Sequence, residues 1–414
     1  MNQSQNRLLK GFRDLLPVDI RKRDSVLNTI KKVFVSYGFE PVETPALEYA
    51  STLLGKYGQD ATKLIYKFRD QGDREIGLRY DLTVPLSRLI SSSTNLQLPF
   101  KRYQIQPVWR ADKPQAGRFR EFLQCDADII GVKSVKADIE VIKIAITGLE
   151  ELGLKDFKII MNDRQILFET IKDQGFKKEE IFSIIRSLDK LDKIGEKGVE
   201  EELIKNGFSK KAKDLLQIIK NNQPSENLNE IFNYFKQVDL ENKIEFSPTL
   251  ARGLDYYTGM IFEMVSKDYS SGSIGSGGRY DNLVKNNRGE YLPAVGFSFG
   301  IDRLLEALEK QNVKINSNDQ TQVLVTVFDK DYEMQSESIA DKLREKNINV
   351  EVYLENEKLN KQLKYADKKN IPYVIIIGPD EVKNNTLTIK ELSSGRQTSV
   401  ATDKIDQLLS FLNH

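Results

Sequence analysis

The sequence predicts an α+β domain that carries a helical insertion and is followed by a smaller α/β domain. Apolar and polar residues alternate between residues 76 and 131, which is the period of half-buried strands. Residues 171–244 are rich in Lys and Glu and carry apolar residues at helical spacing. Beyond residue 320, continuous apolar runs alternate with helical patterns, which is typical of a buried and largely parallel sheet.

These patterns predict where the domains begin and end. We expect the first domain to comprise residues 1–170 and 245–312, with the insertion at 171–244 between its two parts. A polar linker at 313–320 then leads to the second domain at 321–414. A chain of 414 residues is longer than most single domains, which agrees with this division.

The first domain begins with a helix and continues in extended structure. Apolar residues at helical spacing predict a helix over residues 18–37, and Gly38 stands where it would end. Two prolines indicate an extended segment at residues 40–45. Alternation then predicts a strand at residues 78–84, with Arg79, Asp81 and Thr83 on its polar face.

A long hairpin follows, in which one strand ends at Arg110, a polar loop occupies residues 111–117, and the return strand runs from Arg118 to Gly131. Leu123, Cys125 and the next alternate residues form the apolar face of the return strand. Since solvated faces usually carry Lys, Glu and Thr, we favour a binding surface for the other face. That face carries Arg118, Arg120, Phe122, Gln124, Asp126 and Asp128.

Helical and strand patterns alternate through the rest of the chain. Residues 135–153 predict a helix, and strand signals with many glycines return between residues 246 and 300 before a helix from Ile301. In the second domain, strands are predicted at residues 323–328, 350–353 and 373–378, with helices between them.

Composition limits the chemistry that the chain can perform. The only histidine is His414, so an internal Ser-His-Asp triad, a histidine metal site and a histidine general base are excluded. The only cysteine, Cys125, excludes an internal disulfide and a thiolate zinc cluster. Stabilisation of charge by arginine, lysine and backbone groups is therefore favoured, and phosphoryl or nucleotidyl transfer is the leading reaction class.

Targeting signals and net charge say less about the cellular location and the partners of the protein than composition says about its chemistry. No run approaches the roughly 20 apolar residues that span a membrane, and the N-terminus lacks the apolar core of a signal peptide. A cytoplasmic location is therefore expected. The net charge of +1 neither supports nor excludes a nucleic-acid partner.

Residues 252–259 read Arg-Gly-Leu-Asp-Tyr-Tyr-Thr-Gly and form the most informative stretch of the chain. The arginine offers a fork of donors suited to a carboxylate or a phosphate, and the tyrosines offer rings and hydroxyls for a pocket wall. A polar turn beside a strand is the alternative, and the octapeptide alone does not decide between them. The glycine-rich residues 272–281 could cradle a phosphate, although a flexible hairpin is the commoner explanation.

Taken together, these segments resemble the histidyl-tRNA synthetases, a family of class II aminoacyl-tRNA synthetases, over nearly the whole chain. Residues 252–259 and 277–281 resemble the two histidine-specific signatures, which are far more specific than the class II motifs. Asp112 departs from the pattern, since motif 2 usually has Glu there. The other matches are residues 10–17 to the N-terminal signature, 43–48 to motif 1, 109–128 to motif 2 and 296–305 to motif 3.

The resemblance implies an antiparallel six-stranded catalytic sheet flanked by helices, a helical insertion and an α/β anticodon-binding domain. It implies a histidine–tRNA ligase that forms histidyl-adenylate from L-histidine and ATP and then transfers histidine to the 3′ end of tRNA(His). Mg²⁺ would accompany the ATP, without histidine or cysteine ligands from the protein. The family also implies a homodimer that forms through the motif 1 region.

The matching positions imply a role for individual residues. Arg252, Arg110 and Arg303 would be catalytic, with Arg252 bridging the substrate carboxylate and the α-phosphate. ATP would be bound by Arg110, Asp112, Arg118, Phe122 and Arg303. Histidine would be bound by Asp81, Leu82, Thr83, Gln124, Asp128, Arg252, Tyr256 and Tyr257, with Asp128 and the two tyrosines reading the imidazole.

Two other kinds of protein share parts of this pattern. A non-catalytic paralogue with a regulatory or RNA-binding role would keep the core but lack the C-terminal domain and parts of the histidine signatures. A synthetase for another amino acid would share motifs 1 to 3 but not the octapeptide. Because both histidine signatures and a C-terminal domain are present, we favour the histidine–tRNA ligase.

Overall fold

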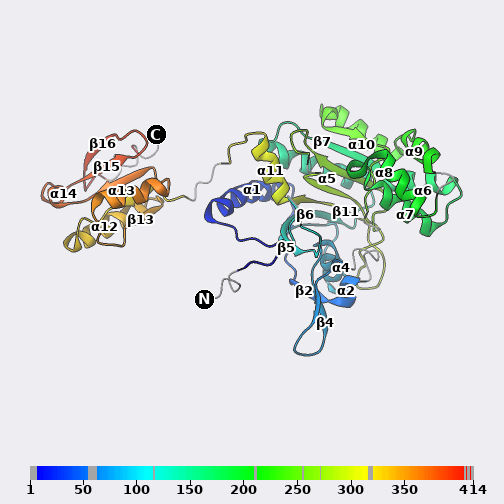
Figure 1. Ribbon diagram of the computed structural model, residues 1–414, viewed down its shortest axis with the longest axis horizontal. Coiled ribbons are helices and arrows are strands. Elements are labelled where there is room, and N and C mark those ends of the chain that lie inside the picture. Colours follow the sequence, from blue (N-terminus) through cyan, green and yellow to red (C-terminus); the bar gives the residue numbers. More distant parts are fainter. Residues whose placement is uncertain are drawn as a thin grey trace. The chain divides into compact units, whose positions relative to one another are not determined.

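The computed structural model of the chain describes residues 7–54, 63–114, 117–208, 212–253, 256–270, 272–315 and 320–404, together with 407 and 411. The chain divides into two compact units, residues 1–315 and residues 316–414. Figure 1 shows the helices and strands of both. In the part of the chain that is described, no helix has the length and apolar character needed to span a membrane.

The N-terminal unit is built on an eight-stranded sheet of order β1-β5-β6-β11-β10-β9-β7-β8. The six strands from β5 to β7 pair antiparallel, as the family resemblance implied. The edge strands β1 and β8 pair in parallel, so the complete sheet is mixed. The strands are β1 (Glu40–Pro41), β5 (Phe100–Trp109), β6 (Glu121–Ile130), β7 (Lys158–Asp163), β8 (Ile244–Phe246), β9 (Met260–Val265), β10 (Gly275–Arg279) and β11 (Ala294–Gly300).

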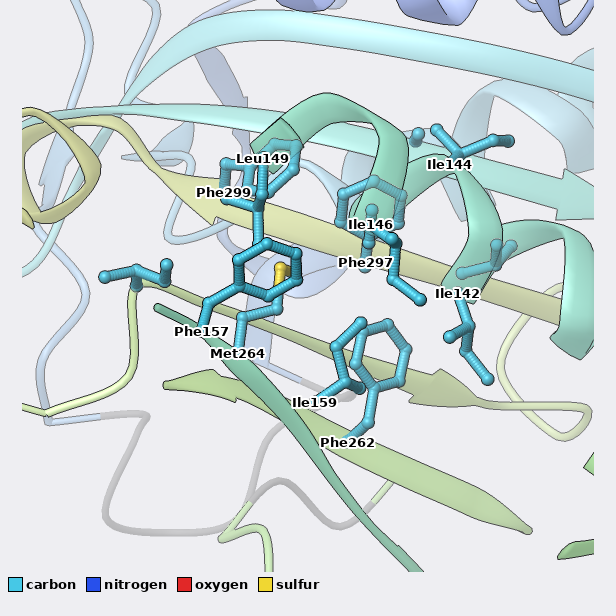
Figure 2. Packing of buried hydrophobic residues seen from close by; sticks show 14 of the residues in the cluster. Ile142, Ile144, Ile146, Leu149, Phe157, Ile159, Phe262, Met264, Phe297 and Phe299 are labelled. Atoms are coloured by element: carbon cyan, nitrogen blue, oxygen red, sulfur yellow. The ribbon is translucent and has the colours of Figure 1, made fainter. Parts of the chain in front are cut away.

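Four helices share a hydrophobic core with this sheet. Three of them confirm sequence predictions, and Gly38, with φ +76°, follows the end of the first. Figure 2 shows Ile142 and Leu149 of α5 packed with Phe262 and Phe299 of the strands. Each such side chain contributes about 1.5–3 kcal/mol when buried, so this core fixes the sheet beneath the helices. The helices are α1 (Pro17–Ser36), α5 (Val135–Glu151), α10 (Glu226–Gln237) and α11 (Ile301–Lys310).

A second, three-stranded sheet of order β2-β4-β3 and two short helices complete this part of the unit. The elements are β2 (Leu47–Tyr49), α2 (Ala50–Leu54), β3 (Lys67–Arg69), β4 (Glu75–Leu78) and α4 (Thr83–Ser92).

The strand predicted at residues 78–84 is wrong beyond Leu78, where β4 ends. Asp81 Oδ1 accepts a hydrogen bond from the backbone N of Val84 at 3.0 Å and so supports the first turn of α4. Arg79 is buried and donates to backbone carbonyls. Both the apolar and the polar residues of this segment are buried. The alternation of apolar and polar residues therefore does not mark a strand with one solvated face.

The helices after β7 form a separate cluster with its own apolar core. Helix α10 differs, because Leu228, Ile231 and Phe235 pack in the core of the main sheet. The insertion bounds of 171 and 244 stay a prediction, but this packing joins α10 to the main sheet. The helices of the separate cluster are α6 (Arg164–Asp173), α7 (Lys178–Leu188), α8 (Leu191–Lys205) and α9 (Ala212–Lys220).

The C-terminal unit contains a five-stranded sheet of order β13-β12-β14-β15-β16. The three predicted strands pair in parallel around β12, and a hairpin that was not predicted adds two antiparallel strands. The strands are β12 (Val323–Val325), β13 (Val350–Val352), β14 (Tyr373–Ile376), β15 (Thr386–Glu391) and β16 (Gln397–Ala401). The helices are α12 (Glu333–Arg344), α13 (Leu359–Lys368) and α14 (Pro379–Lys383).

Candidate active site

The N-terminal unit contains a pocket of about 260 Å³. Side chains and backbone from β6, β10 and β11 line it, and the start of α4, the hairpin loop, α8 and α11 also contribute. Residues that are far apart in the sequence, such as Asp81, Arg118, Arg252 and Arg303, therefore meet at one place.

Asp128 on β6 is a buried carboxylate at the wall of this pocket. Its Oδ2 lies 2.7 Å from Nη2 of Arg102, and its Oδ1 accepts a hydrogen bond from the hydroxyl of Tyr280. The pair with Arg102 follows from the register, in which both residues are opposite each other. Among the described residues, Oδ2 accepts no directed hydrogen bond, so it is suited to accept one from a ligand N–H.

Gly296 makes room for this carboxylate. It lies opposite Asp128 on the neighbouring strand β11. A Cβ at residue 296 would lie 1.9 Å from Oδ1 of Asp128, and 2.7 Å from a backbone oxygen. Only glycine therefore allows β6 and β11 to pair with the carboxylate between them.

A second buried carboxylate, Asp126, makes this part of the pocket rich in acceptors. Burial raises the pKa of Asp126 to about 7, although the Arg102 guanidinium opposes the rise. Burial also raises the pKa of Asp128, again against the attraction of Arg102. Next to them, Nε2 of Gln124 donates to the Ser298 hydroxyl at 2.9 Å. One buried guanidinium thus faces two carboxylates, which favours a ligand that donates hydrogen bonds or carries positive charge.

Arg252 from the octapeptide lines the same pocket and pairs with Glu263 of β9. Its backbone carbonyl accepts a hydrogen bond from Nη1 of Arg164 at 2.9 Å. Burial alone lowers the pKa of the Arg252 guanidinium, but the nearby Glu263 carboxylate raises it, and the net pKa lies above its ordinary value. Arg252 is therefore a permanent positive charge held by a carboxylate partner.

The tyrosines of the octapeptide pack against each other at the pocket wall. The ring centroids of Tyr256 and Tyr257 lie 4.8 Å apart, and those of Tyr256 and Tyr280 lie 5.9 Å apart in an edge arrangement. Burial raises the pKa of Tyr256 and Tyr280 well above the usual value, so both hydroxyls stay neutral. Leu254 and Asp255, also in the octapeptide, lie outside the described residues.

Arg110, directly after the first strand of the hairpin, is held in a fixed direction. Its Nε donates to the carbonyl of Tyr80 at 3.0 Å. Its guanidinium lies 4.4 Å from the ring centroid of Tyr80 and 5.1 Å from that of Phe122. These contacts hold the charge against two aromatic rings at the pocket.

Two more arginines line the pocket. Nη2 of Arg118 lies 2.8 Å from Oδ2 of Asp112. Arg303, in the first turn of α11, donates from Nη1 to the carbonyl of Ser273 at 3.0 Å. With Arg110, these groups supply the fork-shaped donors that bind polyphosphates well.

Every residue to which the family resemblance gave a role lines the pocket, except Leu82. Leu82 is fully buried at the start of α4 and does not line it. Arg120, which alternation placed on the polar face, precedes β6 and donates to the carbonyls of Asp112 and Lys10 instead. It holds the hairpin loop rather than facing a ligand.

Sequence reasoning missed three residues that support the site. Arg102 could have been found, because it alternates with Gln104 on β5, but its partner on β6 depends on the register. Tyr280 is part of the second histidine signature, yet nothing local shows its bond to Asp128. Glu263, the partner of Arg252, lies in an ordinary apolar strand and gives no signal.

The described residues include no group of three or more His, Cys, Asp or Glu side chains that could hold a metal ion.

Comparison with known proteins identifies the family. The family model described as Histidyl-tRNA synthetase matches residues 11–304, and the model described as Anticodon binding domain matches residues 322–412. A histidine–tRNA ligase of Christiangramia forsetii is 38% identical, with 94% of this chain and 96% of the relative covered. One from Helicobacter pylori is 41% identical, with 94% and 95% covered.

A solved structure leads to the same family. The histidyl-tRNA synthetase from Nostoc sp. PCC 7120 has a TM-score of 0.79 and 30% identity, with 98% of this chain and 99% of that chain covered. A Bacillus halodurans structure described as an ATP phosphoribosyltransferase regulatory subunit/histidyl-tRNA synthetase has a TM-score of 0.67 at 23% identity, a likeness of fold alone. With one family model covering most of the chain and relatives matched over nearly their full length, this chain belongs to the histidyl-tRNA synthetase family.

Proposed function

We propose that the pocket activates L-histidine with ATP and that the protein then transfers histidine to the 3′ end of tRNA(His). One observation carries this proposal: the two histidine signatures and the arginines of motifs 2 and 3 line the same pocket. The full-length match to histidine–tRNA ligases favours this activity over a regulatory paralogue.

The acceptor-rich part of the pocket would bind histidine. Imidazole carries a ring N–H, and Oδ2 of Asp128 is a buried acceptor without a directed hydrogen bond from the described residues. Analogues without that N–H would leave the buried Oδ2 of Asp128 without this hydrogen bond, which is costly in a buried site. Tyr256 and Tyr257 would complete the imidazole pocket, and Asp81, Thr83 and Gln124 would hold the ammonium and carboxylate groups. Leu82 would only support them from the core.

The arginine-rich part would bind ATP. Arg110 and Arg303 would contact the phosphates, Arg118 would assist them, and Asp112 would hold Arg118 in place. Phe122 would stack on adenine, which agrees with its ring lining the pocket beside Arg110. Mg²⁺ needs only one or two protein carboxylates when it binds with substrate phosphates, so it would enter with ATP.

The chemistry needs alignment and positive charge more than proton transfer. The histidine carboxylate is ionised at neutral pH and can attack the α-phosphate without a general base. Arg252 would bridge that carboxylate and the α-phosphate, where its charge stabilises the transition state. Pyrophosphate then leaves. A ribose hydroxyl of the tRNA terminus attacks the carbonyl of the adenylate and loses its proton, and AMP leaves as the bond between the carbonyl carbon and the phosphate oxygen breaks.

The C-terminal unit would bind the anticodon region of the tRNA, in line with its family match. A homodimer through the motif 1 region is supported by exposed apolar side chains there. Leu47 in motif 1 and Tyr49 just after it expose 43% and 55% of their surface, and exposed apolar side chains on one strand agree with an interface there. The expected cytoplasmic location stays a prediction.

ATP–pyrophosphate exchange tests the activity. The protein should exchange pyrophosphate with histidine and far less with each of the other standard amino acids. An absence of exchange with histidine, or equal exchange with proline, threonine or glycine, would refute the proposal.

Arg252→Ala tests the central role. Because the lost charge acts in the transition state, kcat/KM for exchange should fall by about a hundredfold to a thousandfold. Arg288→Ala is the matched control, since Arg288 is exposed and does not line the pocket. Circular dichroism of both variants should match the wild type; near-normal exchange by Arg252→Ala would remove the residue from the mechanism.

A further inference from the structure

The N-terminal segment at residues 9–13 lies on the hairpin loop of the pocket, although none of its residues has a proposed contact with histidine or ATP. The backbone N of Arg120 donates to the carbonyl of Gly11 at 2.8 Å, and Nη1 of Arg120 lies 3.2 Å from the carbonyl of Lys10. A Cβ at Gly11, with φ +89°, would meet Pro114 Cγ at 2.8 Å. The segment therefore fits tightly against the loop that carries Arg118.

Arg13 extends this contact to helix α11. Its guanidinium lies 3.7 Å from the ring centroid of Phe119 and pairs with Oδ1 of Asp302. Phe119 and Asp302 both line the pocket, whereas Arg13 does not. One arginine thus ties the motif 2 loop to the first turn of α11.

Asp302 needs Arg13 as an ion-pair partner because it lies at the pocket beside Arg303. It directly precedes Arg303, the arginine proposed for the ATP phosphates, and its Oδ2 is buried without a hydrogen bond from the described residues. Without Arg13, the carboxylate would carry an uncompensated negative charge beside the triphosphate site. It could then repel ATP or capture the Arg303 guanidinium.

We propose that Arg13 is a positioning residue for ATP binding. Arg13 neutralises Asp302 and holds Phe119, so that the motif 2 loop and Arg303 are in place to bind the phosphates. This inference rests on the proposed function, since it assigns Arg13 to the ATP half of that reaction. Arg13 acts through Asp302 and Phe119 and does not touch the substrate.

Lys22→Ala provides a matched control. Lys22 also joins the N-terminal part of the chain to α11, through a 2.7 Å pair with Glu309. That pair is exposed and neither residue lines the pocket. Both variants therefore remove one cation that bonds to α11, but only Arg13→Ala removes it from a carboxylate that lines the pocket.

The test measures KM for ATP and for histidine separately in pyrophosphate exchange. Arg13→Ala should raise KM for ATP by about tenfold, the loss typical of a hydrogen bond to a charged group, and change KM for histidine by less than about twofold. Arg13→Lys should recover part of the loss, because it keeps the charge. Lys22→Ala should leave both constants unchanged.

ATP binding without turnover gives a second readout. Trp109 is the only tryptophan and directly precedes Arg110, so its fluorescence can follow an ATP titration of each variant. The apparent Kd for ATP should rise in Arg13→Ala by the same factor as KM.

The outcomes separate this inference from the proposed function. If the wild type exchanges pyrophosphate with histidine but Arg13→Ala keeps the wild-type KM and Kd for ATP, the positioning role is refuted. Equal rises in KM for ATP and histidine would also refute it, since they indicate a general loss of structure. If the wild type itself shows no exchange with histidine, the proposed function is refuted, and the role of Arg13, which rests on it, is refuted with it.

Discussion

Arg102 carries a charge that is completely removed from water in the sheet below the pocket. Moving such an ion into a protein costs several kcal/mol, and the ion pair with Asp128 offsets this only in part. A buried pair of this kind is weak support for stability, so a role in recognition explains it better. Arg102 keeps Asp128 oriented, and Tyr280 occupies its other oxygen, which leaves one acceptor for the substrate.

Asp126 next to this pair should make stability depend on pH. Burial raises its pKa to about 7, above the value of about 3.9 for an unfolded aspartate. The folded state therefore binds a proton that the unfolded state lacks between these values, so this contribution to stability is present below about pH 4 and is lost as the pH rises to about 7. The stability of Asp126→Asn relative to the wild type should therefore increase between pH 5 and pH 8, on the order of 1–3 kcal/mol.

Urea unfolding followed by Trp109 fluorescence at pH 5 to 8 measures this difference within the N-terminal unit. Asp268→Asn, at an exposed turn, is the control and should follow the wild type at every pH. A stability difference between Asp126→Asn and the wild type that is the same at pH 5 and pH 8 would contradict the assignment.

At the scale of elements, the pairing of β6 with β11 depends on one glycine. Gly296→Ala would place a methyl group on the Asp128 carboxylate and the neighbouring backbone, so either the side chain or the strand must move. Overpacking of this kind costs about 1–3 kcal/mol, and KM for histidine should rise more than KM for ATP.

Gly72→Ala is the control for that variant. Gly72 lies in the turn between β3 and β4. A Cβ added there would lie 3.4 Å from its nearest neighbours, which is an ordinary contact distance. Pyrophosphate exchange at varied histidine and ATP gives the two constants. An unchanged KM for histidine in Gly296→Ala would show that the carboxylate tolerates the methyl group.

Elements with a regular apolar pattern could be predicted, whereas the buried turn between β4 and α4 could not. The hairpin of β5 and β6 follows from alternation, and so does the alignment of Phe122, Gln124 and Asp128 at the pocket. The same rule failed at residues 78–84, where a buried turn leads into a helix. Contacts between strands, such as Arg102 with Asp128, require the register, which a single strand does not contain.

At the scale of the whole molecule, every described residue that lines the pocket belongs to the first of the two units. The main hydrophobic core of this unit also ends at the boundary between the units, since the last partly buried residues that pack on the core are Val313 and Ile315. A fragment of residues 1–315 should therefore fold and keep histidine-dependent pyrophosphate exchange within about threefold of the full chain, because the adenylation site is complete.

The same fragment should lose most of its ability to charge tRNA(His), because it lacks the unit that matches the anticodon-binding family. We expect kcat/KM for aminoacylation to fall by about a hundredfold or more, corresponding to about 3 kcal/mol of lost tRNA binding. Exchange and aminoacylation measured on one preparation of the fragment, beside the full chain, separate the two steps. A folded fragment without exchange would mean that residues 316–414 support the adenylation site itself, and unchanged aminoacylation would mean that the second unit does not contribute to tRNA binding.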